Sequence, residues 1–280
     1  QLAGLITQYH NAQIALKSLE EVMAKPVERP DGAQFLSRDL FKGEVEFKNV
    51  SFSYPDAQME SLSNVSFKIK PGEHVAILGR VGSGKSTLLK LAIGLFQPTS
   101  GAVLIDGIDL RQLDPSDLRS QVGYVPQDVM LFYGSLRDNL TLSHPQASDA
   151  AIVRSVDIAN LAEFVNRHPQ GFDMMIGERG DSLSGGQRKS VALARGIIGE
   201  PSLLLMDEPT GSMDHSTEAA VQKQLVEFIK GRTWLVVTHR NSLLEMVDRI
   251  IVIDNGKLVA DGPRESVVEA LQHGRIGKSK

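Results

Sequence analysis

The chain has 280 residues, with 30 Lys and Arg against 34 Asp and Glu, and its formal net charge of −4 argues against a protein that coats nucleic acid. It contains no cysteine, which excludes disulfides, thiolate metal sites and cysteine nucleophiles. Hydrophobic residues make up 41% and no apolar run approaches the roughly 18 residues that span a bilayer, so we expect a folded, soluble segment. The chain begins with Gln1 and shows no charged region followed by an apolar core, so we expect a segment without a signal peptide, excised from a longer protein.

The beginning of the chain carries a helical stripe. Its apolar residues recur at alternating steps of three and four, which predicts an amphipathic helix that ends before Pro26 and needs a partner surface. The residues of this stripe are Leu2, Leu5, Tyr9, Ala12, Leu16, Leu19 and Met23. From Pro26 to Gly43 no period is sustained, so we expect residues 1–43 to form a helix and linker and residues 44–280 to form one compact domain.

Two kinds of strand are predicted in the compact domain. Apolar and polar residues alternate over residues 44–69, which is typical of antiparallel strands. Later apolar runs are short, continuous and separated by helical stretches, as in a parallel sheet that is buried on both faces. These runs cover residues 74–78, 122–125, 202–206, 235–237 and 250–253. The sequence therefore predicts an α/β fold with a parallel central sheet.

Two further segments have a recognisable local structure. The period between Ser135 and Arg167 is helical, which predicts a mostly α insertion beside the sheet. Asn255 and Gly256 lie between two apolar runs and predict a tight hairpin, because both positions of such a turn need a positive φ.

A glycine-rich segment follows the first run of the parallel sheet and precedes a helical pattern over residues 85–95. It satisfies the phosphate-loop pattern G-x-x-x-x-G-K-[ST], in which backbone N–H groups and a helix N-terminus bind phosphate. We expect Lys85 to reach the β and γ phosphates and Ser86 to ligate Mg²⁺. The candidate phosphate-binding residues are Gly79, Gly82, Ser83, Gly84, Lys85, Ser86 and Thr87. A glycine-rich turn without a ligand is the alternative, which the flanking strand and helix disfavour.

Two adjacent carboxylates end another apolar run. Residues 203–206 predict a buried strand that ends at Asp207, where a carboxylate can hold Mg²⁺ opposite a phosphate loop. Glu208 points elsewhere and can polarise an attacking water as a general base. Two solvated acids at a strand end are the alternative, and the upstream phosphate loop weighs against it.

Beside these motifs, residues 183–187 carry a resemblance to a known family. Their sequence Leu-Ser-Gly-Gly-Gln is similar to the signature of ATP-binding cassette (ABC) proteins, and Gln127 and His239 also follow that family's order. The resemblance covers about residues 44–272. It implies a P-loop NTPase fold: a parallel sheet core, an antiparallel β subdomain, and an α-helical subdomain over about residues 128–190 that carries the signature.

The resemblance implies roles for individual residues. Tyr54 matches the aromatic residue that stacks on adenine, although alone it would be an ordinary strand tyrosine. Gln127 matches a glutamine that contacts Mg²⁺ or the attacking water. His239 matches a histidine that holds the γ-phosphate and orients Glu208. The signature residues implied to face the nucleotide of a second copy are Ser184, Gly185, Gly186 and Gln187.

Other stretches narrow the subclass. Residues 211–214 have the sequence Gly-Ser-Met-Asp, whereas the family's usual sequence is Ser-Ala-Leu-Asp, so only Asp214 matches. The family's coupling between the two nucleotide sites through this loop is therefore not carried over to this chain. Residues 127–139 and 176–180 resemble exporter cassettes. Within exporters, residues 131–139 and 209–214 resemble the ATPases of bacterial type I secretion systems. The initial helix resembles the cytoplasmic end of the last membrane-spanning helix of such exporters; a surface helix packed on its own domain is the alternative.

The resemblance implies an ATPase, with ATP and Mg²⁺ as cofactors, that powers the export of a polypeptide from the cytoplasmic face of the inner membrane. Its implied partners are a second copy of the domain, the membrane-spanning domain of the full-length chain, a periplasmic adaptor and an outer-membrane channel, and not nucleic acid. The alternatives are the ATPase of a lipid or drug exporter, a soluble ABC ATPase acting on nucleic acid, and a regulatory module that binds ATP without hydrolysing it.

Overall fold

The computed structural model describes residues 2–25, 27–30, 32–38, 40–55 and 57–273. The chain divides into two compact units, Gln1–Phe35 and Leu36–Lys280. In the first unit, helix α1 (Leu2–Met23) confirms the predicted helix, and Pro26, expected to follow it, lies outside the described residues. From Leu5 onward the apolar side chains of α1 are exposed. Within the described part of the chain, no helix has the length and apolar content to cross a bilayer.

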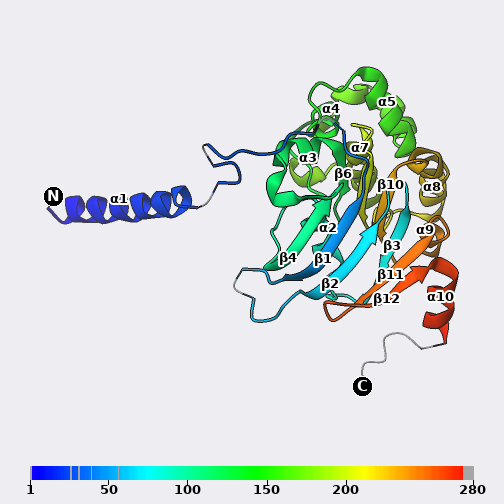
Figure 1. Cartoon of the computed structure of the whole chain (residues 1–280). Helices are drawn as coiled ribbons and strands as arrows, with labels where there is room; N and C mark the ends of the chain where they lie inside the picture. The colour runs from blue at the N-terminus through cyan, green and yellow to red at the C-terminus, as the bar shows by residue number, and fades with distance from the viewer. Residues whose placement is uncertain (1, 26, 31, 39, 56, 274–280) are drawn as a thin grey trace. The chain divides into compact units, whose positions relative to one another are not determined.

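A six-stranded sheet forms the core of the larger unit, in the order β12-β11-β3-β10-β9-β6 (Figure 1). Its strands are β3 (His74–Leu78), β6 (Val122–Val125), β9 (Leu203–Asp207), β10 (Thr233–Val237), β11 (Arg249–Asp254) and β12 (Lys257–Pro263). Neighbouring strands are parallel except for β12, which is antiparallel to β11. Every residue of β9 and β10 is buried, and for this reason both strands have continuous apolar sequences. The predicted parallel sheet is confirmed.

The turn between β11 and β12 confirms the predicted hairpin. Asn255 and Gly256 have φ angles of +46° and +72°, and Asp254 pairs with Lys257 across this two-residue loop. Positive φ at both positions is characteristic of a type I′ turn, whose twist matches that of the flanking strands. The Gly256 N–H also donates to the Ser83 carbonyl at 3.2 Å, so the hairpin supports the phosphate loop.

A second, antiparallel sheet has the order β2-β1-β4-β5. Its strands are β1 (Val45–Phe52), β2 (Leu62–Ile69), β4 (Ser100–Ile105) and β5 (Ile108–Asp109). The antiparallel pair of β1 and β2 confirms the alternating pattern, and the rings of Phe47 and Phe67 stack across it with centroids 4.6 Å apart. Strands β4 and β5 were not predicted from the sequence.

Several helices complete the part of the larger unit that surrounds the sheets. They are α2 (Lys85–Ala92), the 3₁₀ helix η1 (Leu110–Gln112), α3 (Pro115–Gln121), α8 (His215–Ile229), α9 (Asn241–Leu244) and α10 (Arg264–Gln272). Helix α2 ends at Ala92, earlier than the predicted residue 95. Gly94 has a φ of +68°, a left-handed conformation that ends helices.

Residues 134–197 are mostly helical, which confirms the helical period predicted between Ser135 and Arg167. Its elements are β7 (Gly134–Ser135), α4 (Leu136–Leu140), α5 (Asp149–Ile158), α6 (Ala162–Arg167), η2 (Gly171–Asp173), β8 (Met175–Ile176), η3 (Glu178–Gly180) and α7 (Gly185–Ile197). The short antiparallel pair of β7 and β8 was not predicted.

Alternate residues of the central sheet face two separate apolar cores. In β10, Trp234 and Val236 belong to a core that includes residues of α5, α7 and α8. Leu235 and Val237 belong to a core that includes residues of the antiparallel sheet and α2. The central sheet is therefore the middle layer, and the carboxyl ends of its parallel strands meet at one edge, where α/β proteins bind ligands.

Part of the predicted linker packs against the larger unit. Phe41 is buried, and its N–H donates to the Gln121 side-chain oxygen at 2.8 Å. The Lys42 N–H donates to Asp106 at 2.6 Å. The larger unit begins at Leu36, so both contacts lie within it. The assignment of residues 1–43 to a membrane-domain connector stays a prediction.

Candidate nucleotide-binding site

Residues 79–84 connect β3 to α2 and form the phosphate loop. Gly79 and Gly84 have φ angles of +156° and +101°. A Cβ atom on Gly79 would lie 2.0 Å from the Ile253 carbonyl oxygen, and one on Gly84 would lie 2.6 Å from that of Ser61. Both positions therefore require glycine, because the backbone of neighbouring segments approaches the loop too closely for a side chain.

Lys85 begins α2, and its ammonium group lies inside the phosphate loop. Its Nζ donates to the carbonyl oxygens of Gly79 at 2.8 Å and Arg80 at 2.7 Å. Burial lowers the pKa of Lys85, and the charges of Asp207 and Glu208 oppose this shift. The loop thus holds a cation next to the place where phosphate would bind.

Asp207 ends β9 and faces the first turn of α2. The Ser86 hydroxyl hydrogen-bonds to its carboxylate, and burial raises the pKa of Asp207 despite this bond and the charges of nearby lysines. Asp207 Oδ1 and the Ser83 hydroxyl are buried and find no hydrogen-bond partner among the described residues. Buried polar atoms without partners are costly, so these oxygens favour a ligand that would satisfy them. A carboxylate and a hydroxyl beside a phosphate loop fit Mg²⁺.

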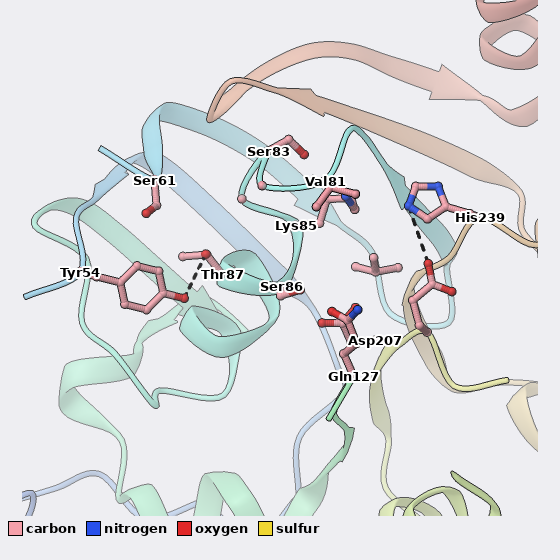
Figure 2. Close-up of a pocket in the computed structure, with 14 residues that line it drawn as sticks. Tyr54, Ser61, Val81, Ser83, Lys85, Ser86, Thr87, Gln127, Asp207 and His239 are labelled. Atoms are coloured by element: carbon pink, nitrogen blue, oxygen red, sulfur yellow. Dashed lines mark hydrogen bonds and ion pairs between the residues drawn. The ribbon is translucent and has the colours of Figure 1, made fainter. Parts of the chain in front are cut away.

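Glu208 has a left-handed backbone, with φ +47°, and its N–H donates to the Val237 carbonyl at 2.8 Å. Such a conformation is unfavourable by roughly 1–3 kcal/mol in a residue with a side chain. It turns the Glu208 carboxylate toward His239, whose Nε2 lies 3.7 Å from Oε1, the contact drawn at His239 in Figure 2. Burial raises the pKa of Glu208, and His239 opposes the shift. The adjacent acids thus have different surroundings, as the sequence predicts.

Tyr54 follows β1, at the other end of the site. Its hydroxyl lies 3.1 Å from Oγ1 of Thr87. The ring meets Phe52 and Phe96 edge to face, with centroid distances of 4.9 and 5.2 Å. These contacts fix the orientation of an aromatic ring beside α2, where it could stack on a base.

These residues line one pocket of about 320 Å³ (Figure 2). Its lining residues are Tyr54, Ser61, Val81, Gly82, Ser83, Gly84, Lys85, Ser86, Thr87, Gln127, Asp207, Glu208, Val237 and His239. Figure 2 shows Tyr54 and Thr87 at one end, His239 at the other, and Lys85 between them. The pocket unites every predicted nucleotide, metal and catalytic residue except Gly79 and the four signature residues.

The signature segment lies outside this pocket. Ser184 caps α7 in a capping box: its hydroxyl accepts from the Gln187 N–H at 3.2 Å, and the Gln187 side chain accepts from the Ser184 N–H at 2.8 Å. Cβ atoms on Gly185 and Gly186 would lie 3.4 Å from atoms of Ser212. This placement agrees with the expectation that the signature serves the nucleotide of a second copy, which stays a prediction.

Sequence reasoning missed Lys189, which is 6% exposed on α7. Its Nζ donates to the Pro126 carbonyl at 3.1 Å and also to the Gln127 carbonyl. Burial lowers the pKa of Lys189. The available signal was helical spacing, because a lysine four residues before the fully buried Leu193 lies on the apolar stripe of its helix. The lysine ties the signature helix to the backbone of Gln127.

Comparison with known sequences gives consistent matches. The profile of the family described as ABC transporter matches residues 62–211. The leukotoxin translocation ATP-binding protein LktB of Mannheimia glucosida is 36% identical over 269 residues, and the toxin RTX-I translocation ATP-binding protein of Actinobacillus pleuropneumoniae is 38% identical over 269 residues. Each of these matches covers 96% of this chain and 38% of the relative. The ABC transporter ATP-binding protein YwjA of Bacillus subtilis (strain 168) is 38% identical over 270 residues, which are 96% of this chain and 47% of YwjA.

Among solved structures, the chain is similar to a bacterial Atm1-family ABC exporter with ATP bound. The TM-score is 0.85 and the sequence identity is 32%, and the match covers 95% of this chain and 48% of that chain. The chain therefore spans less than half the length of each of these relatives.

Proposed function

The chain belongs to the ABC transporter family as an ATP-binding domain, and we propose that two copies of it bind and hydrolyse ATP between them to power export. The family resemblance, the ABC ATPase fold and the ATPase class predicted from the sequence are confirmed. One observation carries the residue assignments. The pocket at the carboxyl ends of β3, β6, β9 and β10 combines a phosphate loop, two carboxylates, a glutamine and a histidine.

ATP would lie along this pocket with its base at the Tyr54 end. The ring of Tyr54 would stack on adenine, and the backbone N–H groups of residues 82–87 would donate to phosphate oxygens. Lys85 would exchange its bonds to the Gly79 and Arg80 carbonyls for bonds to the β and γ phosphates. This exchange replaces two neutral acceptors by charged ones, which form stronger hydrogen bonds with an ammonium group.

Ser86 and Asp207 are the residues that would hold Mg²⁺. Mg²⁺ is commonly bound by one or two protein oxygens together with substrate phosphates, which suits a single carboxylate and hydroxyl. Gln127 lines the same pocket and would contact the ion or the attacking water. The bound ion would neutralise charge on the β and γ phosphates.

Glu208 would act as the general base. Burial raises the pKa of its carboxyl, which strengthens it as a proton acceptor once it is ionised. His239 faces this carboxylate and would orient it while holding the γ-phosphate. Catalysis would then consist mainly of positioning water and stabilising charge, as in other phosphoryl transfers.

A second copy would complete the site. The residues that line the described pocket do not include the signature, whereas Ser184 caps a 13-residue helix that begins with two glycines. The N–H groups and dipole of such a helix N-terminus stabilise phosphate charge. In the dimer that we propose, residues 184–187 of each copy close over the ATP of the other copy.

The relatives favour export of a polypeptide by type I secretion. Two of them are named as toxin and leukotoxin translocation proteins, and both are much longer than this chain. We assign residues 1–43 to a connector from a membrane-spanning domain and residues 44–280 to the ATPase domain, at the cytoplasmic face of the inner membrane. A periplasmic adaptor and an outer-membrane channel would be the further partners. The Atm1-family structure is described only as an ABC exporter, so the ATPase of a lipid or drug exporter stays the second candidate.

Phosphate release from ATP by the purified chain tests the proposal. Because the active form is a dimer, the rate per chain should rise with protein concentration until the dimer saturates. Chelation of Mg²⁺ should abolish the release. ATP binding without phosphate release at saturating protein concentration would instead identify a regulatory module.

A further inference from the structure

Arg240 follows His239 directly, and its side chain reaches the loop that follows Glu208. Its Nη2 donates to the Gly211 carbonyl at 3.1 Å and lies 3.5 Å from the Met213 carbonyl. Its Nη1 forms an ion pair with the carboxylate of Glu218 on α8. One guanidinium group therefore connects the His239 segment, the loop 208–214 and α8.

Glu218 is the anchor of this arrangement, because it is only 5% exposed. A buried carboxylate is stable only when its oxygens are paired. Glu218 Oε1 accepts from the Ser242 hydroxyl at 2.5 Å, and Oε2 accepts from Arg240. The Gln222 amide, one turn further along α8, donates to the Ser242 carbonyl at 2.7 Å. Arg240 and Ser242 thus attach the segment 239–242 to Glu218 and Gln222 of α8.

The loop 208–214 is anchored near its end by the buried Met213 side chain and by Asp214, which caps α8, whereas its middle is exposed. Its sequence contains Gly211 and Ser212, both exposed, and it departs from the family pattern at these positions. Its internal bonds are turns, from the Gly211 N–H to the Glu208 carbonyl at 3.2 Å and from the Met213 N–H to the Thr210 carbonyl at 3.0 Å. Arg240 meets the Gly211 and Met213 carbonyl groups, which these turns do not use. The middle of the loop is therefore held by a side chain that comes from outside it.

We propose that Arg240 and Glu218 form a positioning pair that sets the geometry between Glu208 and His239 and couples it to Ser212 and Met213, which lie next to the signature glycines. Movement of His239 toward a γ-phosphate would pull on Arg240, and Arg240 would move the loop that starts at Glu208 and packs beside Gly185 and Gly186. This inference rests on the proposed function. Because Arg240 contacts backbone carbonyls of this loop, the coupling that we propose between the nucleotide and residues 211–214 does not depend on the family's usual Ser-Ala-Leu-Asp sequence.

The chemistry of the contact requires arginine. A guanidinium group presents several N–H donors in one plane and can bind a carboxylate and backbone carbonyls at the same time. A lysine ammonium on a flexible stem can keep the charge but cannot hold both partners in one fixed geometry. Arg240→Lys is therefore expected to keep the fold and lose part of the positioning, and Arg240→Met to lose all of it.

Arg232 provides a matched control. It is 21% exposed in its side chain, against 27% for Arg240, and it also binds a backbone carbonyl, that of Phe228, and a carboxylate, that of Glu200. It lies outside the pocket. Arg232→Met thus removes a comparable set of contacts without touching the route proposed for Arg240.

The test combines turnover with amide hydrogen exchange. In Arg240→Met, kcat for phosphate release should fall about 10–100-fold while the Kd for ATP stays within about twofold, because small misplacement of catalytic groups affects the rate and not ATP binding. The kcat of Arg240→Lys should lie between those of wild type and Arg240→Met, and Arg232→Met should keep the wild-type kcat. In the ATP-free chain, exchange of the peptide covering residues 208–217 should be faster in Arg240→Met than in wild type and Arg232→Met.

Two results would overturn the positioning pair. One is a folded Arg240→Met variant with wild-type kcat, and the other is unchanged exchange of residues 208–217 in that variant. The exchange measurement does not depend on turnover. A wild-type chain that binds ATP without hydrolysing it would therefore contradict the proposed function, while the exchange result would still decide the role of Arg240.

Discussion

The imidazole Nε2 of His239 lies 3.7 Å from Oε1 of Glu208, and the two side chains differ in exposure, at 57% for His239 and 18% for Glu208. Both residues follow the end of a parallel strand, and the Glu208 N–H donates to the Val237 carbonyl at 2.8 Å. Neighbouring strand ends thus place a shielded carboxylate behind a histidine that is open to an incoming phosphate. In the proposed mechanism, Glu208 therefore accepts the proton and His239 contacts the phosphate.

The first prediction concerns Glu208 as the base. Glu208→Gln is expected to lower kcat for phosphate release about 10²–10⁴-fold, because an amide of the same shape cannot accept a proton. The Kd for ATP, measured by fluorescence titration, should change little. Glu163→Gln on α6 is the control, since that glutamate is exposed and pairs with Arg167. Turnover within a few fold of wild type in Glu208→Gln would remove Glu208 from the base role.

Tyr54 gives a prediction about the base-binding end of the pocket. Stacking of a base on an aromatic side chain is worth about 1–3 kcal/mol, so Tyr54→Ala should raise the Kd for ATP roughly 5–150-fold. Tyr54→Phe keeps the ring and loses only the contact with Thr87, so its Kd should stay near that of wild type. Equal affinities in all three proteins would show that adenine binds elsewhere.

The sequence predicts the parts of the fold that depend on local pattern. Strands β9 and β10 are recognisable because burial on both faces requires continuous apolar residues. The turn at Asn255 and Gly256 is recognisable because few residue pairs adopt positive φ at two successive positions. The phosphate loop is recognisable as well, because close approach of neighbouring backbone requires glycine at fixed positions, and these positions give the motif its spacing.

Other features depend on tertiary contacts and leave little trace in the sequence. The short strand β5 exists only because it pairs with β4, and its two residues carry no period of their own. Glu208 adopts a left-handed φ that its residue type disfavours, because the Val237 carbonyl holds its N–H. Helix α3 is different, since the Asp114 cap and Pro115 at its start form a helix-start signal that is visible in the sequence.

Lys189 gives a prediction about the connection between the signature helix and Gln127. Lys189→Met removes both hydrogen bonds to the carbonyls of Pro126 and Gln127, so the backbone that carries the Gln127 side chain should lose its fixed position. We expect kcat to fall by about tenfold or more, with a small change in the Kd for ATP. Lys223→Met, on the exposed side of α8, is the control. Wild-type kcat in Lys189→Met would show that Gln127 is positioned without this lysine.

Asp207 gives a prediction about pH and stability. Burial raises the pKa of Asp207 above its usual 3.8, so the folded ATP-free chain holds this proton more tightly than the unfolded chain does. The free energy of unfolding therefore loses a contribution as the pH rises from about 3.8 through the raised pKa, and this loss is complete above that pKa. Ionised Asp207 is thus a cost to the ATP-free fold at pH 7.

Asp207→Asn removes that cost, and we expect a higher Tm at pH 7 in the absence of ATP. For a chain of this size, each kcal/mol corresponds to about 2–4 °C. The difference from wild type should shrink as the pH falls through the raised pKa of Asp207, because the wild-type carboxyl then becomes protonated. Added ATP and Mg²⁺ should stabilise wild type more than Asp207→Asn, because a neutral amide holds the ion less well. Calorimetry between pH 4 and 8 measures both effects, and a Tm for Asp207→Asn at or below that of wild type at pH 7 would contradict the assignment.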